Sequence, residues 1–322
     1  MANDYGSLTL TMENIQQTTD TILMVRPAHF GFNEETAANN AFQVNDQSLS
    51  QIEIQEKAKA EFDAFVLQLR AAGINVIVVE DTSEPLTPDA VFPNNWVTFH
   101  QDGLIITYPM YASKRRLERR EDVLNDLAKS YAISNHVRME GYEAENRFLE
   151  GTGSMILDRP NRLVYACLSP RTDPELLEEF GQITGYTPVV FHAVDEQGQD
   201  IYHTNVMMAM GETFVVIVMD SIRDPQEKAD LEALFKVTDK EVIDLSLDQM
   251  QSFAGNMLQV RNTTGQTFLV MSTQAYEALR PQQIELIEKH TRILHSPIKT
   301  IETYGGGSAR CMMAEVFLPK RS

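Results

Sequence analysis

Residues 154–168, SMILDRPNRLVYACL, contain the pattern from which this fold is built. Two apolar segments flank the polar turn Asp158-Arg159-Pro160-Asn161, and this pattern predicts a hairpin of two strands. Residues 173–181 follow with an Asp-Pro start and the apolar spacing of an amphipathic helix. A short apolar strand is then expected at 188–191. Together these segments predict a strand–strand–helix–strand unit.

The same unit recurs along the chain about every 50 to 60 residues, near the upper end of the periods that repeat architectures use. Hairpins are predicted at 95–108, 154–168, 206–219 and 257–271, and an incomplete fifth one pairs 310–318 with 21–26. Helices are predicted at 113–130, 173–181, 224–235 and 274–290. Short strands are predicted at 75–79, 188–191, 241–245 and 293–295. Five such units fit a chain of 322 residues.

No low-complexity linker divides the chain. We therefore expect a single catalytic α/β domain over residues 1–322, in which 1–20 could form a mobile N-terminus. One segment, 30–50, breaks the repeat and is rich in Asn and Glu. Its composition suits either an ordered loop or lid over a functional site or a mobile surface excursion.

Charge and cysteine content exclude several classes of function. The chain has 27 basic and 46 acidic side chains, and the resulting net charge of −19 argues against nucleic acid or an anionic membrane as the main partner. Its two cysteines, Cys167 and Cys311, are too few for a disulfide framework, so a cytoplasmic location is expected. The N-terminus lacks the features of a secretory signal, and no apolar run is long enough to cross a membrane.

Polar residues open the predicted hairpins, and some of them adjoin glycines. They are Asn94 and Asn95, Glu150, His203 with Asn205, Asn256 and, after the run Gly305-Gly306-Gly307, Cys311. In a closed ring of repeats, equivalent positions converge on the central axis. Cys311, His203 and Glu150 would then supply a nucleophile, a general acid/base and a carboxylate. The alternative is that these polar residues cap hairpins and that Cys311, as Cys167 is expected to be, is a small buried core residue.

At these residues the sequence resembles the guanidino-group-modifying, or pentein, superfamily of arginine deiminases, dimethylarginine hydrolases, amidinotransferases and succinylarginine dihydrolases. Within it the chain is most similar to the citrulline-utilisation hydrolase type. The matching motifs lie at 25–27, 30–36, 92–96, 150–154, 202–205 and 305–311, in the expected order. The resemblance implies a five-bladed, pseudo-symmetric α/β propeller of ββαβ repeats. It also places the catalytic cysteine, histidine and carboxylate of the superfamily on Cys311, His203 and Glu150.

The resemblance further implies a substrate carboxylate held by Arg171, in Ser169-Pro170-Arg171-Thr172, although a surface charge at a helix entry is an equally good interpretation. Deiminases clamp the positive guanidinium with two Asp residues, whereas this sequence has Asn95 (or Asn94) and Asn205 at those places. Carboxamides both donate and accept hydrogen bonds, so they suit a neutral ureido group. Succinylarginine dihydrolases also depart from the two-Asp clamp, so the substitution favours citrulline without deciding it.

We therefore expect a hydrolase that converts citrulline to ornithine, ammonia and carbon dioxide through a covalent adduct on Cys311. Asn95 (or Asn94) and Asn205 would hold the ureido group, Asn256 would be a further substrate contact, and Asn33 or Asn39 would assist Arg171. No metal motif is present, and no cofactor is expected. The expected partner is a small amino-acid substrate, possibly with a homo-oligomeric assembly. The alternatives are an arginine deiminase, a dihydrolase or another guanidino enzyme of the superfamily, and a non-catalytic amino-acid-binding propeller.

Overall fold

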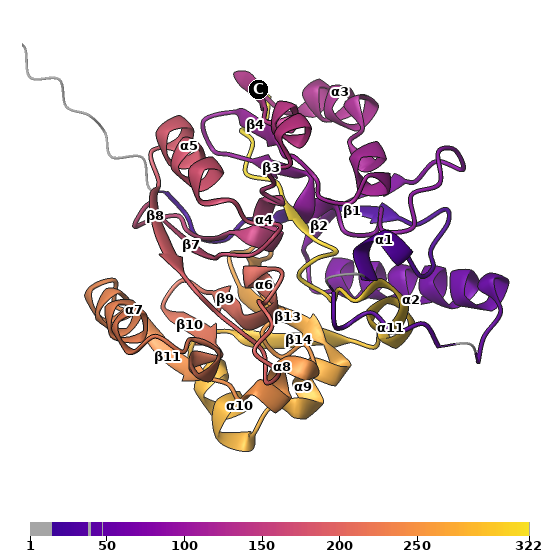
Figure 1. The fold of residues 1–322 in the computed structure, drawn as a ribbon. Helices are drawn as coiled ribbons and strands as arrows, with labels where there is room; N and C mark the ends of the chain where they lie inside the picture. The colour runs from indigo at the N-terminus through magenta and orange to yellow at the C-terminus, as the bar shows by residue number, and fades with distance from the viewer. Residues whose placement is uncertain (1–14, 38–39, 47, 322) are drawn as a thin grey trace, which may run out of the picture.

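The computed structural model describes residues 15–37, 40–46 and 48–321. Its strands form five three-stranded sheets around a common centre, with most helices at the periphery (Figure 1). In chain order, the first sheet contains β3 (Val97–Phe99), β4 (Leu104–Thr107) and β5 (Asn135–Arg138), and the second contains β6 (Ile156–Asp158), β7 (Leu163–Cys167) and β8 (Thr187–Phe191). The third sheet contains β9 (Met208–Met210), β10 (Phe214–Ile217) and β11 (Glu241–Asp244). The fourth contains β12 (Leu258–Arg261), β13 (Thr267–Ser272) and β14 (Arg292–Ser296). The fifth joins the ends of the chain and contains β15 (Ala314–Glu315), β1 (Thr21–Arg26) and β2 (Asn75–Glu80).

Every sheet has the same topology. The first two strands pair antiparallel, as Ile156 with Tyr165 across β6 and β7, and the third strand is parallel to the second, as Cys167 with Phe191 across β7 and β8. An antiparallel pair can be closed by a tight turn, whereas a parallel pair requires a crossover, which is usually helical. The five predicted ββαβ repeats and the α/β propeller architecture are confirmed.

The crossover helices begin where the sequence provides caps. Asp173 and Asp224 accept hydrogen bonds from backbone N–H groups in the first turns of α5 (Pro174–Thr184) and α7 (Pro225–Val237), and each helix begins with proline. Further helices are α1 (Glu34–Ala37), α2 (Gln51–Ala71), α3 (Glu121–Ser130), α8 (Leu247–Gln251), α9 (Thr273–Ala278), α10 (Pro281–Glu288) and α11 (Lys299–Gly305). Short 3-10 turns lie at Lys114–Glu118, Glu140–Glu145 and Met219–Ser221. None of these helices is long and apolar enough to cross a membrane.

Two predicted helices are each divided in the structure. The segment 113–130 contains a 3-10 turn and then α3, because Arg119 and Arg120 between them are extended. The segment 274–290 contains α9 and α10, because Pro281 lacks a backbone N–H and disfavours a helical conformation at Arg280. The long helix α2 and the strand β5 were not predicted.

The N-terminal segment differs from the expectation where the structure describes it. Gln17, Thr18 and Thr19 are buried, and the side chains of Gln17 and Thr19 donate hydrogen bonds of 2.8 and 2.7 Å to the carbonyls of Leu157 and Val316. These contacts fix residues 17–19 between two sheets. Residues 1–14 of the expected mobile N-terminus lie outside the described residues.

Short helical turns carry the polar residues from the starts of the hairpins into the centre of the molecule (Figure 1). These turns are Pro93–Asn95, α4 (Gly151–Ser154) and α6 (Thr204–Met207), and all their residues are buried. Gly151 has a φ of +47°, and a Cβ there would lie 2.3 Å from the carbonyl oxygen of Asn94. Only glycine therefore allows the first two repeats to pack this closely.

Candidate active site

Cys311 lies in a turn after α11, and two carboxamides surround its sulfur. Nδ2 of Asn205 and Nδ2 of Asn256 lie 3.4 and 3.3 Å from Sγ. The backbone N–H of Arg310 donates to Oδ1 of Asn256, which keeps the amide nitrogen turned toward the sulfur. Two N–H donors directed at one sulfur can stabilise negative charge as it develops there. Asn205 and Asn256 thus lie against the sulfur of Cys311, and neither forms part of the wall of the pocket described below.

His203 and Glu150 form a buried pair next to this turn. Nε2 of His203 lies 2.7 Å from Oε2 of Glu150, and Oε1 of Glu150 accepts a hydrogen bond from the backbone N–H of Tyr111. Burial lowers the pKa of His203 to about 4, against the opposing effect of Glu150. Burial would raise the pKa of Glu150, but Arg171 and His203 outweigh it and hold that pKa well below its usual range. The pair therefore rests as a neutral imidazole beside a carboxylate.

Arg171 is 1% exposed and lies beside the same carboxylate. Its Nη1 is 3.5 Å from Oε2 of Glu150, and its Nη2 donates to the carbonyl of Thr36. The guanidinium carbon lies 4.9 Å from the ring centre of Tyr202. Of the two interpretations of Arg171 from the sequence, the structure excludes the exposed surface charge.

One small pocket joins these groups. Its wall is formed by Thr36, Asn40, Asp89, Phe92, Asn95, Arg115, Arg171, Tyr202, His203, Gly305, Gly306, Gly307 and Cys311. Its volume is about 20 Å³, which is room for about one water molecule. Nδ2 of Asn40 donates to the carbonyl of Gly306, and Nε2 of Gln43 donates to the carbonyl of Tyr304. Asn40 and Gln43 of the 30–50 segment are thus fixed against the start of the glycine run.

The expected site residues fall into four groups, of which the first is Asn205 and Asn256 beside the sulfur of Cys311. Cys311, His203, Arg171 and Asn95 lie on the pocket wall, and Glu150 lies behind His203. Asn33 and Asn94 lie beside the pocket: Nδ2 of Asn33 donates to Asp89, and Nδ2 of Asn94 donates to Thr152. Asn39 lies outside the described residues.

Asp89 and Arg115 belong to the site but were missed from the sequence. Oδ2 of Asp89 accepts a hydrogen bond of 2.7 Å from Asn33, while its buried Oδ1 has no hydrogen-bond partner among the described residues. Burial raises the pKa of Asp89, and Arg115 opposes that effect. Arg115 lies 4.0 Å from Oδ2 of Asp89 and binds Glu118 through two of its nitrogens. Asp89 precedes the Phe92-Pro93-Asn94-Asn95 motif by only three residues, and this proximity was the one available signal.

Gly153 allows the reacting side chains to approach each other. A Cβ at this position would lie 2.4 Å from Nδ2 of Asn95 and 2.8 Å from Nδ1 of His203. Nδ2 of Asn95 and Nδ1 of His203, which belong to two different repeats, therefore both lie against the backbone of Gly153. Among the described residues, no group of three or more His, Cys, Asp or Glu side chains is arranged to hold a metal ion.

Comparison with solved structures shows which known proteins have a similar fold. Full-length ArgZ, an arginine dihydrolase from the ornithine-ammonia cycle in cyanobacteria, matches with a TM-score of 0.72 and 16% identity over 93% of this chain. This chain covers 41% of that protein, and hence about two fifths of its length. The N-terminal domain of ArgZ bound to product matches with a TM-score of 0.73 and 17% identity, over 93% of this chain and 98% of the domain.

A third solved structure is a dimethylarginine dimethylaminohydrolase variant that forms an adduct with S-methyl-L-thiocitrulline. It matches with a TM-score of 0.62 and 13% identity, over 92% of this chain and 99% of that one. At these identities the likeness establishes the fold, which is that of the pentein enzymes.

Comparison of sequence gives the family. No curated protein matches the chain. The model of the family described as "N,N dimethylarginine dimethylhydrolase, eukaryotic" matches residues 26–318, which is most of the sequence. The chain belongs to the N,N dimethylarginine dimethylhydrolase family, a family of C–N hydrolases within the guanidino-modifying pentein superfamily.

Proposed function

We propose that this protein hydrolyses a C–N bond at the guanidino carbon of arginine or an arginine-like free amino acid, through a covalent adduct on Cys311. The observation that carries the proposal is that Cys311 and His203 share one pocket with Asp89 and Arg171. A thiol and an imidazole suit attack on the guanidino carbon. A carboxylate and a guanidinium suit the α-amino and α-carboxylate groups of a free amino acid.

The amino-acid end of the substrate is assigned to the two charged residues. Oδ1 of Asp89, which has no hydrogen-bond partner in the described part of the chain, can accept hydrogen bonds from an α-ammonium group, which would also compensate the buried charge. The planar fork of Arg171 suits a carboxylate, for which it would exchange its contact with the carbonyl of Thr36. Recognition of both groups would restrict the enzyme to free amino acids and exclude peptides.

The reacting end is assigned to Cys311 and His203. The sulfur bonds to the guanidino carbon, and Asn205 and Asn256 stabilise the thiolate before the attack. Nδ1 of His203 takes the thiol proton and delivers it to one terminal nitrogen, which leaves as ammonia. Glu150 holds Nε2 of the imidazole and stabilises its protonated form. Water, activated by His203, then displaces the sulfur, so that one turnover on arginine yields citrulline and ammonia. A second cycle on citrulline would yield ornithine, ammonia and carbon dioxide.

Citrulline as the starting substrate is the second candidate, and one observation favours it. The buried Nδ2 of Asn95 has no hydrogen-bond partner among the described residues. This donor lies beside His203, and it can bind the oxygen of a ureido group, whereas a guanidinium offers no acceptor. We place arginine first because the matching family and the solved structures are named for guanidino substrates. In both cases the cytoplasm stays the proposed location, since both cysteines are free thiols.

Incubation of the purified protein with arginine, citrulline and dimethylarginine in separate reactions tests the proposal. We expect arginine to be consumed with release of ammonia, and we expect Cys311→Ala to abolish the reaction while Cys167→Ala retains it. Consumption of citrulline but not arginine would select the second candidate. Thermal stabilisation by these amino acids without any product would instead indicate a non-catalytic binding propeller.

A further inference from the structure

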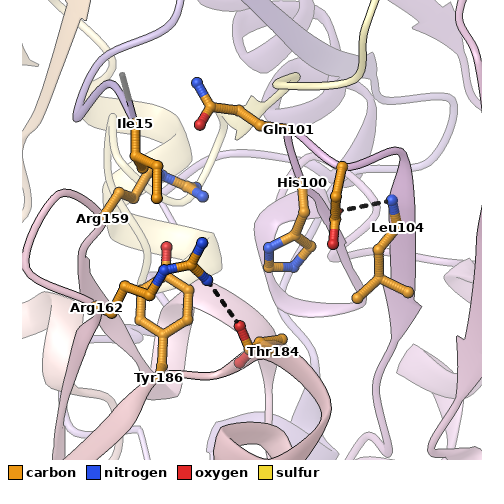
Figure 2. Close-up of a pocket in the computed structure, with 9 residues that line it drawn as sticks. Ile15, His100, Gln101, Leu104, Arg159, Arg162, Thr184 and Tyr186 are labelled. Carbon is orange, nitrogen blue, oxygen red and sulfur yellow. Dashed lines mark hydrogen bonds between the residues drawn. The ribbon is translucent and has the colours of Figure 1, made fainter. Parts of the chain in front are cut away.

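A second pocket lies at the turns of the first two hairpins, and Figure 2 shows residues that line it. It is formed between the turn 100–103, which connects β3 to β4, and the turn 159–162, which connects β6 to β7. Asn95 and Glu150 precede the first strands of these hairpins, so the active site and this pocket lie at different ends of the same strands. The two pockets have no lining residue in common.

Arg159 contributes a buried positive charge to this second pocket. It is 4% exposed, and its guanidinium carbon lies 3.8 Å from the ring centre of Phe317. Its Nη2 is 3.5 Å from Oε1 of Glu315, whose other oxygen accepts a hydrogen bond of 2.9 Å from buried Arg310. Two buried guanidinium groups thus share one carboxylate. A buried charge without full compensation is costly, so a further anion at Arg159 would be stabilising.

Arg162 contributes a second positive charge from the same turn. Its side chain is exposed, and Nη1 donates a hydrogen bond of 3.1 Å to the carbonyl of Thr184. Burial raises the pKa of Tyr186, and the charges of Arg159 and Arg162 both oppose that effect, so both guanidinium groups lie near the phenol. Figure 2 shows the two arginines on one side of the pocket, with Gln101 and His100 on the other.

The remaining lining residues leave the pocket with a net positive charge. Asp102 is the acidic lining residue; it is exposed, and its Oδ1 accepts a hydrogen bond from the backbone N–H of Leu104. Burial lowers the pKa of His100 to about 3, and this ring is therefore neutral at physiological pH. The pocket volume is about 60 Å³, which is room for about four water molecules, or for one small polyatomic ion.

We propose that this pocket is a binding site for a small oxyanion, a phosphate or a carboxylate group, held by Arg159 and Arg162. Guanidinium forks bind both kinds of group through paired charge-assisted hydrogen bonds. The Gln101 amide and the Tyr186 hydroxyl supply neutral polar contacts at its edges. The site is independent of the proposed reaction, because neither arginine contacts Cys311, His203 or Glu150 in the structure.

Titration of the full-length protein with inorganic phosphate and, separately, with acetate tests this site. Ionic strength is held constant with sodium chloride, and binding is followed by calorimetry and by the shift in Tm. We expect saturable binding of at least one of the two anions. Whether phosphate or acetate binds more tightly then identifies the class of group that the site prefers.

Arg162→Gln is the decisive variant, because its exposed side chain can be replaced without disturbing the core. Its affinity for the bound anion should fall by about tenfold or more, since a charge-assisted hydrogen bond is lost. Arg292→Gln, which changes an exposed arginine on β14, should bind as the wild type does. Equal binding by wild type and Arg162→Gln, or no binding of either anion beyond the effect of chloride, would overturn the proposal.

Discussion

Nη1 of Arg115 donates a hydrogen bond of 2.7 Å to Oδ1 of Asn95. Glu118 holds the same guanidinium with two bonds of 2.9 Å, to Nε and to Nη2. Because the amide oxygen of Asn95 is occupied in this way, its nitrogen is directed to the reacting end of the pocket, above Gly153 and beside His203. A residue that could have accepted hydrogen bonds from a guanidinium therefore offers a donor instead.

Replacement of this donor tests how the pocket selects its substrate. Asn95→Asp would put an acceptor-only carboxylate beside the reacting carbon, where it can pair with a guanidinium but not with a ureido oxygen. We expect the ratio of kcat/KM for arginine to that for citrulline to rise by about tenfold or more, as for a gained charge-assisted hydrogen bond. Steady-state kinetics with both substrates measure this ratio. A ratio that is unchanged or lower would show that Asn95 does not face the substrate.

Gly153 should tolerate no side chain. The added methyl group of Gly153→Ala would collide with Asn95 and His203, and displacement of reacting groups by an ångström lowers rates strongly. We expect kcat to fall by about a hundredfold. Gly141→Ala is the matched control, because a Cβ at that position meets no atom within 4 Å. Equal activity of the two variants would contradict the close approach of His203 and Asn95.

Asp89 should act on substrate affinity. Removal of its charge in Asp89→Asn weakens the proposed contact with the α-ammonium group, a change that we expect to raise KM for arginine about tenfold or more. The KM for 5-guanidinopentanoate, which is arginine without the α-amino group, should change little. If both substrates lose affinity equally, Asp89 supports the pocket wall without binding the amine.

Stability should depend on pH through buried His100. Burial lowers its pKa to about 3 in the folded protein, and an unfolded histidine titrates near pH 6.5. Between these values the unfolded chain binds a proton that the folded chain does not, so the free energy of unfolding falls as the pH drops. His100 alone should contribute a loss of about 2 kcal/mol between pH 7 and pH 5.

The variant His100→Gln should lack this part of the pH dependence. Its glutamine can still hydrogen-bond Thr98, the partner of His100 in the folded protein. Urea unfolding at both pH values measures the difference between the two proteins. If the free energy of unfolding changes equally with pH in the wild type and in the variant, His100 takes up its proton in the folded state as well.

The sequence allowed the architecture to be predicted because turn residues and apolar strands recur in each repeat. The three catalytic candidates could be found for the same reason, as polar residues at equivalent positions before or at the start of the hairpins. The helix α2 was also accessible, because Ile54, Ala58, Phe62 and Leu69 have helical spacing. The short polar strand β5, in contrast, has no alternating apolar pattern and forms only because β4 pairs with it.

The polar network around the pocket could not be predicted. Arg115 lies in the segment 113–130, for which only a helix was predicted, and its burial depends on Glu118 and on Asn95, which is 20 residues away along the chain. Likewise, the positions of Asn205 and Asn256 beside the sulfur follow from the closure of the ring. The contacts of Asn205 and Asn256 with Cys311 join different repeats, and the contact of Arg115 with Asn95 spans a whole hairpin, so no local pattern encodes them.

The most direct test of the central claim is peptide mass spectrometry of the protein quenched in acid during turnover of arginine. Nucleophilic attack by Cys311 predicts that the peptide containing this residue gains the mass of arginine less that of ammonia. The gain should be absent from the peptide containing Cys167 and from the variant Cys311→Ala. The same measurement is made at quench times that sample the steady state, and it is repeated with the slower variant His203→Gln. Turnover of arginine with an unmodified Cys311 peptide in both experiments would contradict the account.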